Sequence, residues 1–182
     1  HMQYLEGLRP SITDPRYLWA RPKVWLEFDE LDKANLAIKE VIADTSGVAT
    51  VFAVNNMPIY VIRSGDHSLL AATVLASERL FEFWASARMQ NAISLLRATS
   101  AYFYADLVTL RSELNQINPI LLDNGYETTG FLYAGLGDLE RAHELLLQGL
   151  EREADDMCDQ GWLMYWLARL HWDAGRVGAI RG

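Results

Sequence analysis

Apolar residues recur at intervals of three and four positions through most of the chain. This spacing places apolar side chains on one face of an α-helix. Short links such as Gly135-Leu136-Gly137 leave room only for antiparallel neighbours. Asn118-Pro119 is typical of a helix end, and Pro22 should kink or split the first helix. The pattern predicts helices over about 15–28, 30–43, 67–87, 92–114, 120–135, 138–153 and 160–173.

The segment 48–63 fits two structures. Its β-branched residues flank Asn55-Asn56-Met57-Pro58, which is a composition typical of a β-hairpin. The three-residue spacing of Val48, Val51 and Val54 favours a helix instead, with Pro58 in its interior at a cost of about 3 kcal/mol. A hairpin and a broken helix both stay open here.

The composition is that of one globular domain, expected to extend from 3 to 182 and to be mainly all-α. Hydrophobic residues make up 51% of the 182 residues and charged residues 22%, as in ordinary globular domains. His1-Met2 reads as the remnant of a purification tag. The longest apolar stretch, 69–87, contains Glu78, Arg79 and Glu82, so no membrane span is expected.

The cysteine count and the net charge indicate which cellular compartment and which classes of partner to expect. A single cysteine cannot form an intramolecular disulfide, and no signal peptide pattern follows the first residues. We therefore expect a cytoplasmic protein. The net charge of −8 and the pI near 4.9 disfavour direct binding to nucleic acid, which is held largely by clustered Lys and Arg.

One segment, 124–154, resembles a tetratricopeptide repeat. Its motif places small residues where two helices approach, larger residues between the helices and glycine at the turn. These positions are Gly130, Tyr133, Gly137, Asp138, Ala142 and Leu146. Gly149 and Ala154 depart from the family, which prefers alanine and proline there.

A partial second copy covers 160–182, with Leu167, Ala168, Ala174 and Gly175 in matching positions. The resemblance implies antiparallel helix pairs stacked as a short superhelix, because such units bury their apolar faces only against neighbours. It also implies that Leu167, Ala168 and His171 face the interior of the last helix pair.

Four residues near the C-terminus form a candidate binding row. Trp162, Tyr165, Arg169 and Trp172 lie at i, i+3, i+7 and i+10, so a helix places them on one side. Large aromatic residues and arginine are typical of interaction hot spots. The resemblance assigns the row to the concave ligand surface and gives matching positions one unit earlier. Those earlier positions are Asn124, Glu127 and Phe131. Packing of the row against the rest of the last unit is the alternative.

Catalytic and metal-binding patterns are incomplete in the sequence. Glu140 stands where the dinucleotide fingerprint that begins at Gly135 needs a third glycine. Glu140 and His143 have the spacing of a di-iron ligand pair but no second copy. Asp66-His67-Ser68 is expected to start a helix, and Cys158 with His171 has no feature that would activate the thiol. We predict no catalytic residue, metal ligand or cofactor.

These observations favour a protein- or peptide-binding scaffold within a larger bacterial protein. Two alternatives come from other classes. The chain would be the sensor or oligomerisation domain of a transcriptional regulator if it held a small-molecule pocket or formed a homodimer. It would be an enzyme of unrecognised type if a deep cleft held several perturbed ionisable groups.

Overall fold

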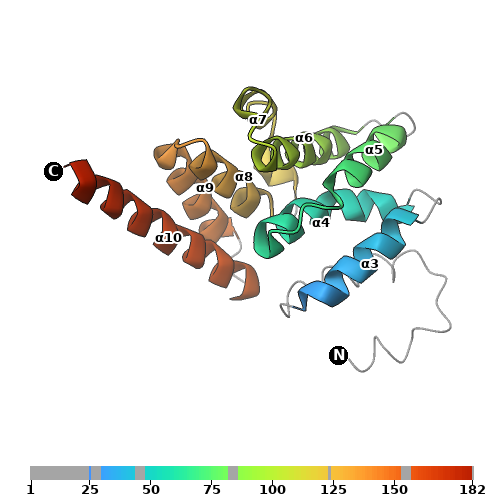
Figure 1. The fold of residues 1–182 in the computed structure, drawn as a ribbon, viewed down its shortest axis with the longest axis horizontal. Coiled ribbons are helices and arrows are strands. Elements are labelled where there is room, and N and C mark those ends of the chain that lie inside the picture. Colours follow the sequence, from blue (N-terminus) through green and yellow to red (C-terminus); the bar gives the residue numbers. More distant parts are fainter. Residues whose placement is uncertain are drawn as a thin grey trace. The chain divides into compact units, whose positions relative to one another are not determined.

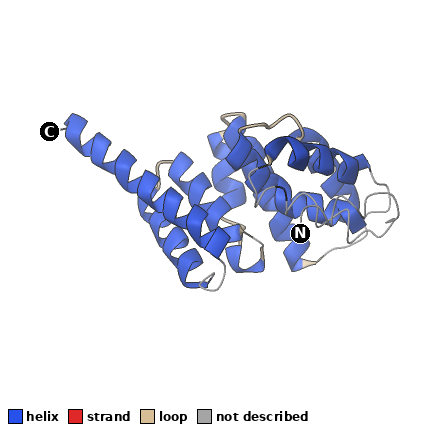
Figure 2. Cartoon of the chain, turned by 90° about the horizontal axis from the view of Figure 1, so that it is seen from below, coloured by secondary structure: helices blue, strands red, loops and turns tan. Residues whose placement is uncertain are grey.

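The structure is a computed structural model that describes residues 25, 30–43, 48–81, 86–122, 124–152 and 157–181. All regular structure in these ranges is helical (Figure 1; Figure 2). The prediction of an all-α chain is confirmed for this part, whereas the predicted helix over 15–28 lies almost wholly outside it. In chain order the elements are α3 (Leu31–Ala43), α4 (Val48–Ser64), α5 (Leu70–Phe81), α6 (Ala87–Phe103), α7 (Leu107–Leu114), the 3-10 helix η1 (Pro119–Leu121), α8 (Gly125–Gly135), α9 (Leu139–Arg152) and α10 (Met157–Arg181).

The chain divides into two compact units, 1–96 and 97–182, and α6 contributes residues to both. In the first unit α4 packs against α3 and against α5. The buried face of α3 carries Ala34, Ala37, Ile38 and Val41, which has the three- and four-residue spacing that the sequence indicates. The helix predicted over 30–43 is therefore confirmed.

The segment 48–63 belongs to helix α4, so the hairpin alternative is wrong. Pro58 lies inside this helix and is buried. Nearly every side chain around it is also buried, including Val54, Met57 and Val61. Burying one such apolar side chain contributes about 1.5–3 kcal/mol, so several together offset the cost of an interior proline.

Asp66 connects α3, α4 and the start of α5. Its Oδ2 accepts hydrogen bonds from Asn35 Nδ2 at 2.7 Å and from the Tyr60 hydroxyl at 3.2 Å. Its Oδ1 accepts the backbone N–H of Ser68 at 2.9 Å. The bonds from Ser68 are the main cause that lowers the pKa of Asp66, while burial raises the pKa of Tyr60. Asp66-His67-Ser68 thus lies in the turn that leads into α5, which begins at Leu70 and not at residue 67 as the sequence predicted.

Replacing Asp66 with alanine should lower the free energy of unfolding by about 1–2 kcal/mol. The change removes the acceptor for the Ser68 N–H in the turn and, at the same time, the acceptor for the buried Tyr60 hydroxyl. Asp66→Asn keeps an acceptor oxygen and should cost less. Urea unfolding of the two variants measures both values. Equal costs would show that the acceptor oxygen does not hold this turn.

The lowered pKa of Asp66 also predicts an acid dependence of stability. The pKa in the folded state lies below the unfolded value, so the carboxylate stabilises the fold above the unfolded pKa. That contribution is lost as the pH falls through the folded pKa, below about pH 4. Asp106 has a lowered pKa for the same kind of reason and acts with the same sign. Asp66→Asn should therefore flatten the acid limb of the stability curve without abolishing it, and a limb of unchanged slope would contradict this assignment.

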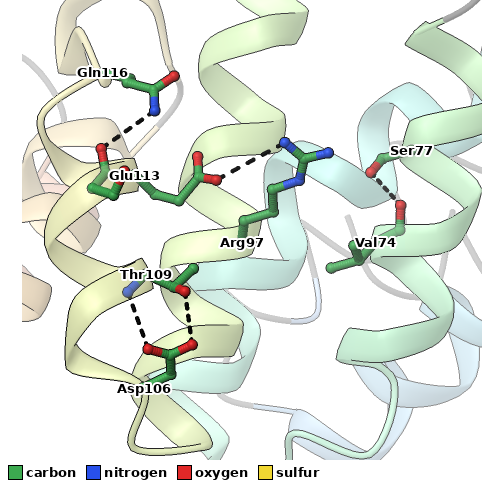
Figure 3. Close-up of polar contacts among 8 residues, drawn as sticks. Val74, Ser77, Arg97, Asp106, Thr109, Glu113 and Gln116 are labelled. Atoms are coloured by element: carbon green, nitrogen blue, oxygen red, sulfur yellow. Dashed lines mark hydrogen bonds and ion pairs between the residues drawn. The ribbon is translucent and has the colours of Figure 1, made fainter.

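The helix predicted over 92–114 is two helices, α6 and α7. Ala105 has a positive φ of 59°, and Asp106 caps α7. The Asp106 carboxylate accepts the N–H of Thr109 at 3.0 Å and its hydroxyl at 2.7 Å (Figure 3). The break is therefore a capped turn within an apolar run. Figure 3 also shows the ion pair of Arg97 with Glu113, which joins α6 to α7 at 3.9 Å.

Helices α8 and α9 approach closely at Gly130, where an added Cβ would lie 2.8 Å from Leu146 Cγ. Ala142 and Leu146 on the facing side of α9 are buried. Gly137 in the connecting turn has a φ of +80°, a value that few residues other than glycine adopt. These roles of Gly130, Gly137, Ala142 and Leu146 are the ones predicted from the sequence.

Gly149 is a second point of close approach. An added Cβ there would lie 2.9 Å from both Leu163 Cδ2 on α10 and Tyr126 Cβ on α8. Leu146, Leu163 and Leu167 form the core between α9 and α10. The glycine that departs from the repeat pattern therefore allows three helices to meet.

Candidate functional site

The candidate row on α10 lies at the protein surface. Trp172 is 65% exposed and Tyr165 is 47% exposed. Arg169 is exposed and Trp162 is half-buried. The apolar stripe of the same helix lies at other positions, Leu163, Leu167 and Leu170, all of which are buried. Among the described residues the row therefore belongs to the outer face of α10 and not to its core.

Two residues that the repeat alignment assigned to the interior are exposed. Ala168 and His171 lie on the surface, and of the three aligned positions only Leu167 is buried. The reason is geometric, since consecutive helical residues differ in direction by about 100°. Residues 168 and 171 each follow a position of the narrow buried stripe, so the helix turns them away from it.

A series of edge-to-face aromatic contacts leads from α6 through α8 to α10. The Tyr102 ring contacts Phe131 at a centroid distance of 5.2 Å, and Phe131 contacts Trp166 at 4.9 Å. Trp166 contacts Tyr165 at 4.9 Å, and Tyr165 contacts Trp162 at 5.8 Å. Each such pair contributes roughly 0.5–1.5 kcal/mol beyond its buried area. We call Tyr102, Phe131, Trp166, Tyr165 and Trp162 the aromatic series.

A buried carboxylate fixes the centre of this series. Trp166 Nε1 donates a hydrogen bond to Glu127 Oε1 at 3.1 Å, and the Glu127 side chain is only 2% exposed. Because a buried charge is costly without hydrogen-bond donors, this bond favours one orientation of the indole. The resemblance assigned Glu127 to the ligand surface, whereas the structure buries this side chain against Trp166.

The structure brings together four of the predicted residues, Glu127, Phe131, Trp162 and Tyr165, and Trp166 is the residue that links them. Trp166 was absent from the predicted row, although its place four residues after Trp162 is also a helical neighbour position. Including that spacing would have found it.

The remaining predicted residues are Arg169, Trp172 and Asn124. Arg169 and Trp172 follow on the next two turns of α10. Asn124 is half-buried at the N-cap of α8 with a φ of 53° and no side-chain capping bond. Asparagine is one of the few residues that tolerate this left-handed conformation. The conformation at Asn124 therefore has a backbone explanation.

Trp166→Phe should lower the free energy of unfolding by about 1–3 kcal/mol. The change keeps a ring in the aromatic series but removes one donor from the buried carboxylate of Glu127. Trp172→Phe is the matched control on the exposed side of α10 and should leave the free energy of unfolding within about 0.5 kcal/mol. Chemical denaturation measures both. Equal effects would show that the Glu127 bond does not contribute.

The other ionisable side chains that the sequence singled out form no metal-binding group in the described part of the chain. Arg141 and Glu144 form an exposed ion pair at 2.9 Å, and Glu140 is exposed nearby. The described residues contain no group of three or more His, Cys, Asp or Glu that could hold a metal ion. The side chain of Cys158 lies outside the described part of the chain. None of the helices described is long and apolar enough to cross a membrane.

No protein-family model, curated protein or solved structure matches this chain.

Proposed function

We propose that the chain is a helical-repeat module that binds a protein or peptide through the outer face of α10. The observation that carries the proposal is the exposure of Tyr165 and Trp172 on a helix whose opposite stripe is buried. Covering a ring as exposed as Trp172 would stabilise a complex by roughly 2–4 kcal/mol. Exposed aromatic residues are also costly to keep on a surface unless they are scattered or functional.

The aromatic series supports this proposal because it gives the face a rigid base. Tyr165 contacts Trp166, and Trp166 is held by Glu127 and Phe131. A binding side chain that is already ordered loses less entropy when a partner covers it. Tyr165 and Trp162 are therefore suited to act as preorganised anchors.

The finer parts of the proposal come from the sequence. They are the resemblance to tetratricopeptide repeats, the stacking of helix pairs as a short superhelix, and the place of the chain within a larger cytoplasmic bacterial protein. The close α8 and α9 packing at Gly130 and Ala142 supports the repeat-like character of this pair.

Site-specific photocrosslinking tests the proposed face. Benzoylphenylalanine would replace Tyr165 in the intact parent protein, and a matched variant would carry it in place of Tyr104, which is 59% exposed beside α7. We expect a discrete crosslinked partner from position 165 and none from position 104. Crosslinking from 104 alone would place the interaction surface elsewhere.

A further inference from the structure

Two histidines from neighbouring helices meet beside the proposed binding face. His143 on α9 and His171 on α10 have ring centroids 5.1 Å apart, with an interplanar angle of 79°. His143 is half-buried and His171 is exposed. Both rings are therefore within reach of solvent and of a dissolved ion.

The packing of α9 on α10 fixes the distance between these two helix turns. Leu146 follows His143 by one turn, and Leu167 precedes His171 by one turn. Both leucines lie in the same buried cluster. Further along, Gly149 lets α10 approach so closely that a Cβ would meet Leu163 at 2.9 Å. The histidine pair is thus carried by two closely packed helices of the second unit.

We infer that His143 and His171 form an inter-helix binding site for a zinc-like divalent cation. Zinc–imidazole bonds are about 2.0–2.1 Å long and tetrahedral in arrangement, so two imidazoles on one zinc ion have centroids roughly 5 Å apart. The observed separation meets this requirement without movement of either helix. Only the rings need to turn, and the second torsion of histidine is broad.

Within the described part of the chain, His143 and His171 are the two ligands of this ion, since these residues contain no group of three potential ligands. Water molecules would complete the coordination, as they do in open zinc sites. The net negative charge of the second unit favours a cation, because residues 97–182 contain thirteen Asp and Glu against seven Arg and no Lys. A bound ion would tie the α10 turn that carries Trp172 to α9, and the site does not depend on the proposed peptide binding.

Calorimetric titration of the full chain with zinc chloride, after removal of metal with EDTA, tests this site. Single variants His143→Phe and His171→Phe keep a ring for the edge-to-face contact but remove the ligand nitrogens. His67→Phe, an exposed residue of the first unit, is the control, and His1 is present in every protein. We expect each of the first two variants to bind zinc at least about tenfold more weakly than wild type, and His67→Phe to bind as wild type does.

Thermal unfolding gives a second readout on the same proteins. Zinc should raise the melting temperature of wild type and of His67→Phe, because an ion that binds only the folded state stabilises it. It should not raise that of His143→Phe or His171→Phe. Equal zinc affinity in wild type and both variants, or no zinc binding by wild type, would overturn the site and leave an aromatic packing contact.

Discussion

Ala142→Glu should destabilise the protein by about 3 kcal/mol or more. Ala142 is fully buried on α9, and its carbonyl oxygen would lie only 3.4 Å from a Cβ added at Gly130 on α8. The helices have no space for a longer side chain, and the carboxylate would be buried without a partner. Both effects act in the same direction, so this is the largest loss of stability that we expect from a single substitution.

The matched control is Gln148→Glu, which adds the same charge on an exposed position of the same helix. It should change the free energy of unfolding by less than about 0.5 kcal/mol. Thermal or urea unfolding of the two variants gives the comparison. A wild-type melting temperature for Ala142→Glu would show that α8 and α9 do not pack as described.

The α8 and α9 pair was predictable because its signals are local. Gly137 ends one helix by its backbone freedom, and the small residues Gly130 and Ala142 mark where the helices touch. The break between α6 and α7 also has a local signal, since Asp106 precedes Thr109 by the spacing of a helix cap. This capping signal was missed because the apolar residues on both sides suggested one continuous helix. One of these apolar residues, Val108, is 83% exposed in the structure.

The helix at 48–63 could not be settled by local reasoning. Pro58 and the β-branched residues argue against a helix there. What decides the structure is packing of α4 against both α3 and α5, which leaves residues such as Met57 and Val61 fully buried. Such tertiary burial is invisible in a pattern of single residues.

In the candidate face, too, local spacing predicted some features and tertiary packing decided the others. Helical spacing alone placed Tyr165 and Trp172 on one side of α10, and both are exposed in the structure. The bond between Trp166 and Glu127 joins residues 39 positions apart. No periodicity within one helix predicts such a pairing, so the buried part of the site was missed.

Trp172→Ala should barely change folding stability but should clearly weaken partner binding if the side chain belongs to the binding face. The side chain is 65% exposed, so its loss should cost less than about 1 kcal/mol of folding free energy. A core tryptophan would cost about 3–5 kcal/mol. If Trp172 is a hot spot, partner affinity should fall by at least about tenfold, which is 1.4 kcal/mol.

Val108→Ala is the control for this variant. Val108 is an exposed apolar residue of the same unit, on α7 and outside the row. The substitution removes apolar surface but should change neither the free energy of unfolding beyond about 0.5 kcal/mol nor partner affinity.

The most direct test measures the dissociation constant of the crosslinked partner for wild type and Trp172→Ala, with urea unfolding of the same preparations. The proposed binding face predicts a dissociation constant at least about tenfold higher for the variant and an almost unchanged unfolding midpoint. An unchanged dissociation constant would contradict it, as would a loss of about 3–5 kcal/mol in folding free energy.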